Sequence, residues 1–305
     1  MRLLAGLLAA ATLATPPLHF PRDHYGHQAG VEWWYFTGYG HGADGHRYSV
    51  FFTLFKRAGF VLPVSQAVNL DTGKIVEHTE QLVRASIGPT GVAFIEQNAS
   101  LRYDARRNTW YAGVGGKNYE LAFSARPTKA YVLHGGGTGL IRQGAATSRY
   151  YSATRMTMTG TLRPSGGKRV SFTGTSWFDH QWGDFTSDPS ASHWDWFSCR
   201  FDDRTELMLY RFHDGHKNGT AVDRAGHGRP VTSFDAKPGN RVLWAAGRRW
   251  PLDWTLSVPS KHLTERLHAI VPDQLFRSIL LPTFWEGAVT ATGTKNGICF
   301  VEETS

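Results

Sequence analysis

Short β-prone segments recur along almost the whole chain, and they constrain the fold more than any other feature. After residue 30, runs rich in Val, Thr, Phe, Tyr and Trp are interrupted at intervals of about 8 to 12 residues by Gly, Asn, Asp or Pro. The run Arg155–Leu162 alternates methionine with threonine, which places the two residue types on opposite faces of a strand. Helical periodicity is scarce, and a short helix is predicted only at Asp273–Leu281, between two prolines. The sequence therefore predicts an all-β protein with little helix.

The strands are expected to run antiparallel. Gly-containing turns such as His41–Gly45 and Asp71–Gly73 connect neighbouring runs in the manner of hairpins. Because helices do not alternate with the strands, parallel βαβ units are excluded. The pattern suggests β-barrels or sandwiches, and closed barrels fit best, since closure removes exposed strand edges.

Two similar sequence motifs predict two such units. Glu32–Gly38 (EWWYFTG) and His193–Cys199 (HWDWFSC) each open a strand with two tryptophans and an acid. Between them, Gly183–Ser192 is polar and small, as a link between domains is. We expect a boundary near residue 185, so that residues 15–185 form an N-terminal and residues 186–305 a C-terminal domain, packed together.

The first residues have the composition of an export signal. Met1–Pro17 (MRLLAGLLAAATLATPP) contains one arginine, an apolar stretch of about twelve residues and small residues before two prolines. We expect residues 1–14 to be a signal peptide and the mature protein to be exported: periplasmic, in the cell envelope or secreted. A buried N-terminal helix is the alternative. No later apolar run approaches the roughly 20 residues of a membrane-spanning helix.

Charge and cysteine content restrict the partners. The chain carries 33 basic and 25 acidic residues, a formal net charge of +8. The basic residues form no nucleic-acid-binding motif, so we expect no nucleic-acid partner, whereas a basic surface suits peripheral contact with an anionic membrane. Cys199 and Cys299 lie in strand-like runs, where one disulfide and two buried thiols are both open alternatives. The oligomeric state is not determined by these features.

Six motifs in a fixed order give the chain a family resemblance. Two of them, EWWYxTG at Glu32–Gly38 and WxDHxWG at Trp177–Gly183, form a specific combination. The full set is Tyr25–Gly38, Tyr151–Met156, Thr175–Gly183, Trp194–Phe197, Glu206–Tyr210 and Trp285–Gly287. In these motifs the chain resembles the AttH-like branch of the carotenoid 1,2-hydratase (hydroxyneurosporene synthase) family, over almost the whole mature length.

The resemblance implies two lipocalin-like barrels or half-barrels with a hydrophobic site, which either adds water to a polyene or cyclises it. Hydratase members use the His and Trp of the DHxW motif, which correspond to His180 and Trp182, and a Tyr-x-Asp on a later strand. Here Tyr210 is retained, but Phe212 replaces the Asp, and Asp214 on the same strand face would have to compensate. Loss of this carboxylate weakens the case for hydration, which needs a proton donor and a positioned water.

Asp179 and His180 are the centre of the predicted catalytic site. On a strand His180 and Trp182 point to one side and Asp179 to the other. A buried imidazole beside an indole would act as an acid or base near neutral pH, with Asp179 orienting it and Tyr210 as a second hydrogen-bond donor. The alternative is a structural role, in which Asp179 and His180 satisfy buried backbone groups at the domain junction.

Glu32 is the remaining catalytic candidate. On a strand it shares a face with Trp34, whereas Tyr35 faces the opposite side. A carboxylate among rings needs a partner, because an unpaired buried charge costs several kcal/mol or more. We expect Arg155 to be that partner, either in a catalytic arrangement or in a structural Arg–Glu pair that closes the barrel.

Aromatic side chains are expected to line the substrate site. Their faces would stabilise a cationic olefin by about 0.5 to 2 kcal/mol each, or hold a folded conformer for cyclisation. A core role is the alternative for each of the eleven tryptophans. The predicted substrate-binding residues are Trp34, Tyr35, Trp182, Trp194, Trp196, Phe212, Arg155 and Trp285.

The sequence predicts neither a metal centre nor an organic cofactor. The early histidines are loosely spaced, and no Cys or carboxylate cluster completes a set of four ligands; they are His24, His27, His41 and His46. Gly174–Phe178 departs from the GxSxG motif of hydrolases, and no Gly-rich loop leads from a strand into a helix.

These features favour an exported, cofactor-independent enzyme of the lyase or isomerase type. It would bind a hydrophobic polyene, isoprenoid or polyketide-like molecule and cyclise it, rearrange it or hydrate a C=C bond. The rival hypothesis is a non-catalytic lipid- or isoprenoid-binding carrier of the cell envelope, which the export signal and Phe212 support. Substrate identity, and the choice between hydration, cyclisation and binding, stay open.

Overall fold

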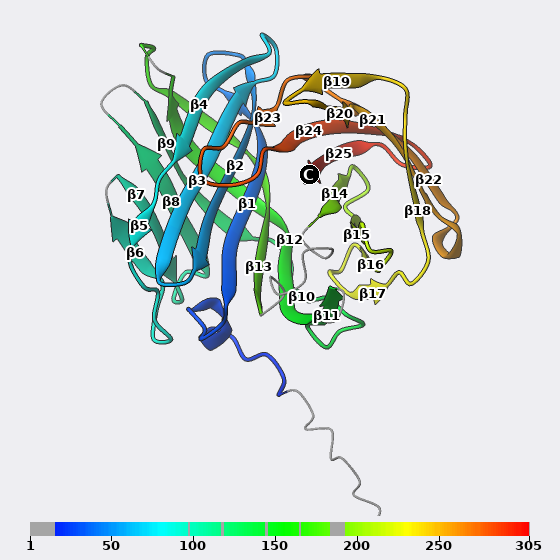
Figure 1. Ribbon diagram of the computed structural model, residues 1–305, viewed down its shortest axis with the longest axis horizontal. Helices are drawn as coiled ribbons and strands as arrows, with labels where there is room; N and C mark the ends of the chain where they lie inside the picture. Colours follow the sequence, from blue (N-terminus) through cyan, green and yellow to red (C-terminus); the bar gives the residue numbers. More distant parts are fainter. Residues whose placement is uncertain are drawn as a thin grey trace, which may run out of the picture.

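The computed structural model of the protein describes residues 16–96, 98–116, 119–143, 146–164, 166–183 and 193–304. Within them the chain forms two large antiparallel sheets that pack side by side (Figure 1). The predicted signal peptide, residues 1–14, and the predicted boundary near residue 185 lie outside the described residues. In the described part of the chain, no helix is long and apolar enough to cross a membrane.

Thirteen strands of the described residues form the first sheet. They are β1 (Val31–Gly42), β2 (Arg47–Arg57), β3 (Phe60–Asn69), β4 (Lys74–Glu80), β5 (Val83–Arg84), β6 (Ala93–Glu96), β7 (Ala99–Asp104), β8 (Thr109–Gly115), β9 (Glu120–Pro127), β10 (Val132–Leu133), β11 (Leu140–Gln143), β12 (Ala146–Arg163) and β13 (Val170–Gly183). Their order is β4-β3-β2-β1-β13-β12-β9-β8-β7-β6, with β5 beside β3 and with β10 and β11 beside β12. The sheet curls into a half-barrel (Figure 1).

Ten strands of the described residues form the second sheet. They are β14 (Trp194–Phe201), β15 (Glu206–Phe212), β16 (Lys217–Val222), β17 (Gly228–Pro230), β18 (Asp235–Pro238), β21 (Asp253–Val258), β22 (Leu263–Ala269), β23 (Leu275–Phe276), β24 (Phe284–Gly293) and β25 (Gly297–Glu303). Their order is β17-β16-β15-β14-β25-β24-β22-β21-β18, with β23 beside β24. A separate hairpin consists of β19 (Val242–Ala245) and β20 (Arg248–Pro251), and the described residues also include the short 3-10 helices η1 (Arg22–His24) and η4 (Pro259–Lys261).

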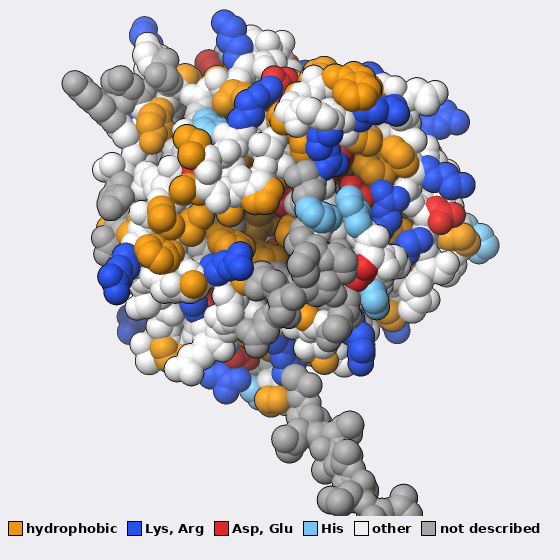
Figure 2. Space-filling view, in the orientation of Figure 1, with side chains coloured by type: hydrophobic (Ala, Val, Ile, Leu, Met, Phe, Trp, Pro, Cys, Tyr) orange, Lys and Arg blue, Asp and Glu red, His pale blue; other side chains and the backbone are white. Residues whose placement is uncertain are grey.

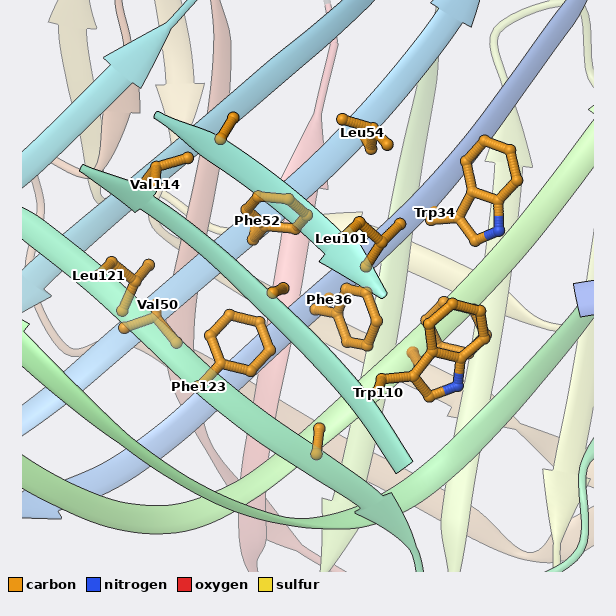
Figure 3. Close-up of a cluster of buried hydrophobic side chains, with 14 of the residues drawn as sticks. Trp34, Phe36, Val50, Phe52, Leu54, Leu101, Trp110, Val114, Leu121 and Phe123 are labelled. Carbon is orange, nitrogen blue, oxygen red and sulfur yellow. The ribbon is translucent and has the colours of Figure 1, made fainter. Parts of the chain in front are cut away.

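Four hydrophobic clusters of the described residues follow from the alternation of side chains along these strands, and the smallest consists of Phe51, Leu62, Val64 and Phe276. The first fills the half-barrel of the first sheet, where Phe36 of β1 lies 5.9 Å from Trp110 and 5.6 Å from Phe123, measured between ring centroids (Figure 3). The second fills the second sheet and contains the disulfide between Cys199 and Cys299, which are paired residues of β14 and β25. The third lies between the two sheets. The prediction of an all-β fold made of two packed half-barrels is confirmed.

The helix predicted at Asp273–Leu281 is wrong. Leu275 and Phe276 form β23, which pairs with the start of β24. Phe276 is fully buried, and its ring lies 5.4 Å from that of Phe51 on β2 and 5.0 Å from that of Phe284. Contacts with the first sheet therefore hold this segment extended, and a helix that short has little stability of its own.

Candidate active site between the two sheets

Strands β1 and β13 are paired, and they separate two groups of polar residues. Because side chains alternate along each strand, the pair Tyr35 and Asp179 faces the second sheet, whereas the pair Trp34 and His180 faces the core of the first. The prediction that Asp179 and His180 point in opposite directions is confirmed. Each face has its own chemistry.

On the inner face, Glu32 is fully buried in a network of basic groups. Its carboxylate lies 2.6 Å from Lys56 Nζ, 2.7 Å from His27 Nδ1 and 3.0 Å from His180 Nε2. Burial pushes the Glu32 pKa upward, but hydrogen bonds with His180 and His27 outweigh it and lower the pKa to about 2. Glu32 is therefore an anion at neutral pH, held at the end of the half-barrel.

The predicted pairing of Arg155 with Glu32 is wrong. Arg155 Nε lies 2.6 Å from Glu206, whose carboxylate also lies 2.7 Å from Lys129 Nζ. The reason is a shift in register between β12 and β13, which falls between Ala153 and Met156. Such an irregularity re-aims the side chains within it, and Arg155 reaches the second sheet instead of the first core.

The predicted role of Asp179 in orienting His180 is also wrong, because the two side chains lie on opposite faces. His180 Nδ1 lies 3.0 Å from the Tyr151 hydroxyl and 3.1 Å from the carbonyl oxygen of Asp23. Burial lowers the pKa of His180 to about 4, so the imidazole is neutral at pH 7. His180 is thus fixed between Asp23, which precedes β1 in the chain, and Glu32 on β1.

His27, Glu32 and His180 form a donor set that a metal ion could use. One ligand atom of each lies within 4.8 Å of the others. This set was not predicted from the sequence, because His27 was grouped with the other early histidines, whereas His180 belongs to the distant strand β13. The second carboxylate oxygen of Glu32 accepts a hydrogen bond from the Lys56 ammonium, so both oxygens of Glu32 are engaged by side chains of the protein.

A cavity of about 450 Å³ lies on the other face of β1 and β13, between the two sheets. In Figure 2 it is a hollow surrounded by hydrophobic side chains, beside the C-terminal end of β25. Rings form much of its wall: Trp33, Phe51, Phe55, Trp194, Trp196 and Phe284. Its polar groups belong to Tyr35, Tyr150, Asp179, Gln181, Tyr210 and Glu302. The size and the apolar lining with a few polar groups suit a small hydrophobic ligand.

Asp179 is the polar centre on the first sheet's side of the cavity. Its carboxylate accepts hydrogen bonds from Tyr150 Oη at 2.7 Å, Trp177 Nε1 at 2.6 Å and the Ser152 hydroxyl. Tyr150 is held in turn by Trp196 Nε1 at 3.1 Å. Burial raises the pKa of Asp179 to about 7, and the three donors offset only part of that rise. Asp179 can therefore change its charge near neutral pH.

The second sheet presents two further carboxyl groups in one row. Glu286, Glu302 and Trp196 occupy paired positions on β24, β25 and β14, so they share the face directed at Asp179. Burial, together with the nearby Asp179, raises the pKa of Glu302 to about 7. The pKa of Glu286 lies well above its ordinary value because of burial and Glu302, and Glu286 accepts a 2.7 Å hydrogen bond from Tyr35 Oη.

Five of the predicted site residues meet at this cavity: Tyr35, Asp179, Trp194, Trp196 and Tyr210. The ring of Phe212 packs on that of Tyr210, with 4.3 Å between centroids. No hydrogen bond of the Tyr210 hydroxyl occurs among the described residues, which leaves this donor available to a ligand. Asp214 does not compensate for Phe212, because it lies in the turn after β15, 3.0 Å from His216.

The other predicted residues lie elsewhere. Glu32, Trp34, His180 and Trp182 share the inner face of the first sheet. Trp285 packs in the second core and donates to the carbonyl of Pro272 at 2.9 Å. Their predicted parts in catalysis or binding stay predictions, and the structure separates them from the cavity by the backbone of a sheet.

Glu302, Glu286, Tyr150 and Gln181 line or adjoin the cavity and were missed from the sequence. Glu286 belongs to the Trp285–Gly287 motif, which offered a signal. Glu302 lies in a run that was interpreted only as a final strand, Gly297–Ser305. Alternation from Cys299 would have placed Glu302 on the face opposite to the disulfide, but only the packing of the sheets brings it toward Asp179.

A family model described as AttH-like matches residues 11–305. The chain belongs to the AttH-like family. A crystal structure of a Nitrosomonas europaea protein described as AttH superposes on this AttH-like protein with a TM-score of 0.84 and 25% sequence identity, over 95% of this chain and 97% of that one. The resemblance inferred from the motifs is thereby confirmed.

Two matched proteins are kievitone hydratases. The enzyme of Fusarium solani subsp. phaseoli is 24% identical over 199 residues, which are 60% of this chain and 54% of that protein, so the match spans about half of the relative's length. A crystal structure of kievitone hydratase from Nectria haematococca has a TM-score of 0.83 at 18% identity, over 96% of this chain and 94% of that one. The latter comparison concerns the fold alone.

Proposed function

We propose that this AttH-like protein is a hydratase-type lyase that adds water to a C=C bond of a hydrophobic, isoprenoid-type substrate in the cavity between the sheets. The observation that carries the proposal is a pair of carboxyl groups, Asp179 and Glu302, each with a pKa of about 7, in an aromatic cavity. Hydration needs one group that gives a proton and another that takes one, and two coupled carboxyls supply both near neutral pH. The similarity to a kievitone hydratase supports water addition as the reaction type.

The two carboxyls divide the roles according to their surroundings. Asp179 accepts three hydrogen bonds, which favour its anionic form. The negative charge of Asp179 in turn favours the protonated form of Glu302. Because the two groups titrate as a coupled pair, one proton shared between them gives a neutral Glu302 and an ionised Asp179.

In the proposed reaction, Glu302 transfers its proton to one carbon of the alkene, and positive charge develops on the other carbon. The faces of Trp33, Trp194 and Trp196 stabilise this cation by about 0.5 to 2 kcal/mol each. A water molecule adds to the cation, and the Asp179 carboxylate accepts the proton that this water loses. The proton returns to Glu302 through solvent, so the net change is the addition of one water.

The remaining polar groups position the reactants. The Tyr210 hydroxyl, which no described residue engages, can hold the attacking water or a hydroxyl of the substrate. The Tyr35 hydroxyl is already engaged by its hydrogen bond to Glu286, which links the two sheets beside the cavity. The cavity holds the water and the alkene together in one orientation. Because binding has already restricted their motion, less entropy is lost in reaching the transition state, and the barrier is lower.

The test is mass spectrometry of products after incubation with prenylated phenols and acyclic isoprenoids in ¹⁸O-labelled water. We expect a product heavier by one labelled water, and we expect Glu302→Gln and Asp179→Asn to reduce turnover by about 100-fold or more. Glu303→Gln is the matched control, since Glu303 is the next residue of β25 but faces the second core, where it accepts a 3.1 Å hydrogen bond from Trp254 Nε1. It should keep turnover.

Other outcomes would replace the proposal. An isomer of unchanged mass would mean cyclisation or rearrangement, and a ligand recovered unaltered with both wild type and variants would mean a carrier. If His180→Ala abolished turnover in a folded protein while Glu302→Gln retained it, the proton donor would lie on the inner face of β13, as the DHxW motif suggests.

A further inference from the structure

Exposed hydrophobic side chains are concentrated at the mouth of the cavity. Among the described residues, eight large hydrophobic side chains are exposed, and four of them are Phe60, Leu82, Ile279 and Leu280. Phe60, Leu82 and Leu280 line the cavity, and Ile279 precedes Leu280 in the chain. With 93% of its surface exposed, Ile279 is the most prominent of the eight. We call these four residues the apolar rim.

The apolar rim is held in place by hydrogen bonds. Glu80, at the end of β4, accepts hydrogen bonds from the backbone N–H of Ile279 at 2.7 Å and of Leu280 at 3.0 Å, and from the Ser278 hydroxyl. Leu281 packs against buried residues beneath the rim. Ile279 therefore points into solvent from a fixed loop, and its exposure is a built feature of the fold.

Two arginines flank the apolar rim. Arg57 pairs with Phe60 across β2 and β3, and Phe60 pairs with Arg84 across β3 and β5, so the three side chains form one row on one face. Both arginines are exposed, and neither has an acidic partner among the described residues. By contrast, the nearby basic residues Lys56, next to Arg57 in the chain, and Arg277, two residues before Ile279, are paired with Glu32 and Asp273.

We infer that the cavity mouth docks on an anionic lipid bilayer. The apolar rim enters the boundary between headgroups and acyl chains, and Arg57 and Arg84 contact lipid phosphates. The apolar side chains complement lipid acyl chains and the two arginines without acidic partners complement lipid phosphates, so the rim suits a fluid anionic surface; a second copy of the chain is the alternative that the test below separates. The bilayer thus delivers a membrane-dissolved ligand to the cavity without its passage through water, whatever reaction follows.

The experiment is co-sedimentation of the purified protein with vesicles of phosphatidylcholine alone and of phosphatidylcholine with phosphatidylglycerol. We expect binding to the anionic vesicles that weakens with rising salt. Ile279→Asp should weaken it by about 10-fold or more, because a charge replaces an apolar side chain in the lipid. Arg84→Gln should reduce the preference for anionic over neutral vesicles. Ile95→Asp is the matched control, since Ile95 is 74% exposed on β6, outside the rim, and should bind as wild type does.

Three results would overturn the inference. The first is no binding of the wild type to anionic vesicles at low salt. The second is equal loss of binding in Ile279→Asp and Ile95→Asp, which would mean general hydrophobic adhesion. The third is a stable dimer in light scattering that Ile279→Asp converts to a monomer, which would mean that the apolar rim joins two copies of the chain. None of these readouts depends on turnover, so they are independent of the proposed hydratase activity.

Discussion

Replacement of Asp179 by Asn should stabilise the protein while removing its activity. Asn keeps the shape of the side chain and an oxygen that accepts from Ser152 and Trp177, and its amide can donate to the Tyr150 hydroxyl. What it removes is a carboxylate that burial disfavours. A carboxylate that destabilises the folded state when it is ionised is expected at an active site rather than in a structural network.

The magnitude follows from the raised pKa of Asp179. Burial moves this pKa from 3.8 to about 7, and each pKa unit corresponds to about 1.4 kcal/mol. Because the folded state holds the proton more tightly than the unfolded state, the penalty grows as pH rises from 3.8 to 7 and is constant above that. It amounts to about 2 kcal/mol at pH 5 and about 4 kcal/mol at pH 8, so the advantage of Asp179→Asn should be about 2 kcal/mol larger at pH 8.

The assay is urea unfolding of wild type and Asp179→Asn at pH 5 and pH 8, with the free energy of unfolding compared at each pH. Asp235→Asn is the control, because the Asp235 side chain is 63% exposed and should give no gain that depends on pH. If Asp179→Asn were less stable than wild type at pH 8, or if its advantage did not change between the two pH values, the assignment of Asp179 as a strained, titrating carboxyl would be refuted.

Three further predictions concern stability, each measured by urea unfolding. Glu32→Gln should lower the free energy of unfolding by about 3 to 5 kcal/mol at pH 7, since it leaves the Lys56 ammonium without its anionic partner. The difference in stability between wild type and Glu32→Gln should shrink as pH falls from 4.5 toward 2, where wild-type Glu32 becomes protonated. Arg200→Met should raise the free energy of unfolding by about 1 to 3 kcal/mol, because Arg200 is 5% exposed and its guanidinium nitrogens have no hydrogen-bond acceptor in the described ranges. Unchanged or lower stability would mean that Arg200 has a partner. Cys199→Ala with Cys299→Ala should lower the free energy of unfolding by about 2 to 5 kcal/mol, and a reducing agent should lower wild-type stability equally; no difference in either case would contradict a structural disulfide.

Much of the local structure could be predicted from the sequence because strand alternation has a period of two. The segment Glu32–Gly38 lies in β1, with Trp34 and Tyr35 on opposite faces as expected. The all-β class followed from the same pattern. Motif order was sufficient to assign the AttH-like family. By contrast, the prediction of a helix at Asp273–Leu281 was wrong, because contacts of Phe276 with the first sheet hold this segment in an extended conformation.

The candidate site was predicted only in part. Tyr35 was predicted as a substrate-binding residue and Asp179 as a catalytic one, and both line the cavity. The sequence did not indicate that they are paired across β1 and β13, or which face of β13 borders a cavity. The proton donor was predicted to be His180, whose ring lies in the first core against Trp34. Arg155 was predicted to pair with Glu32, because the register shift in β12 cannot be recognised from composition. Glu302 was missed entirely.

The sequence by itself determined the all-β class and the alternation of side chains along strands such as β1, since these depend on neighbours within a few residues, and the order of its motifs determined the family. The tertiary structure alone decided that Asp179 and Glu302 share one cavity, because they belong to different sheets and meet only when the two half-barrels pack. It also decided their chemistry. A carboxyl on a strand is an ordinary acid until packing removes water from it, and that loss of water raises both pKa values to about 7.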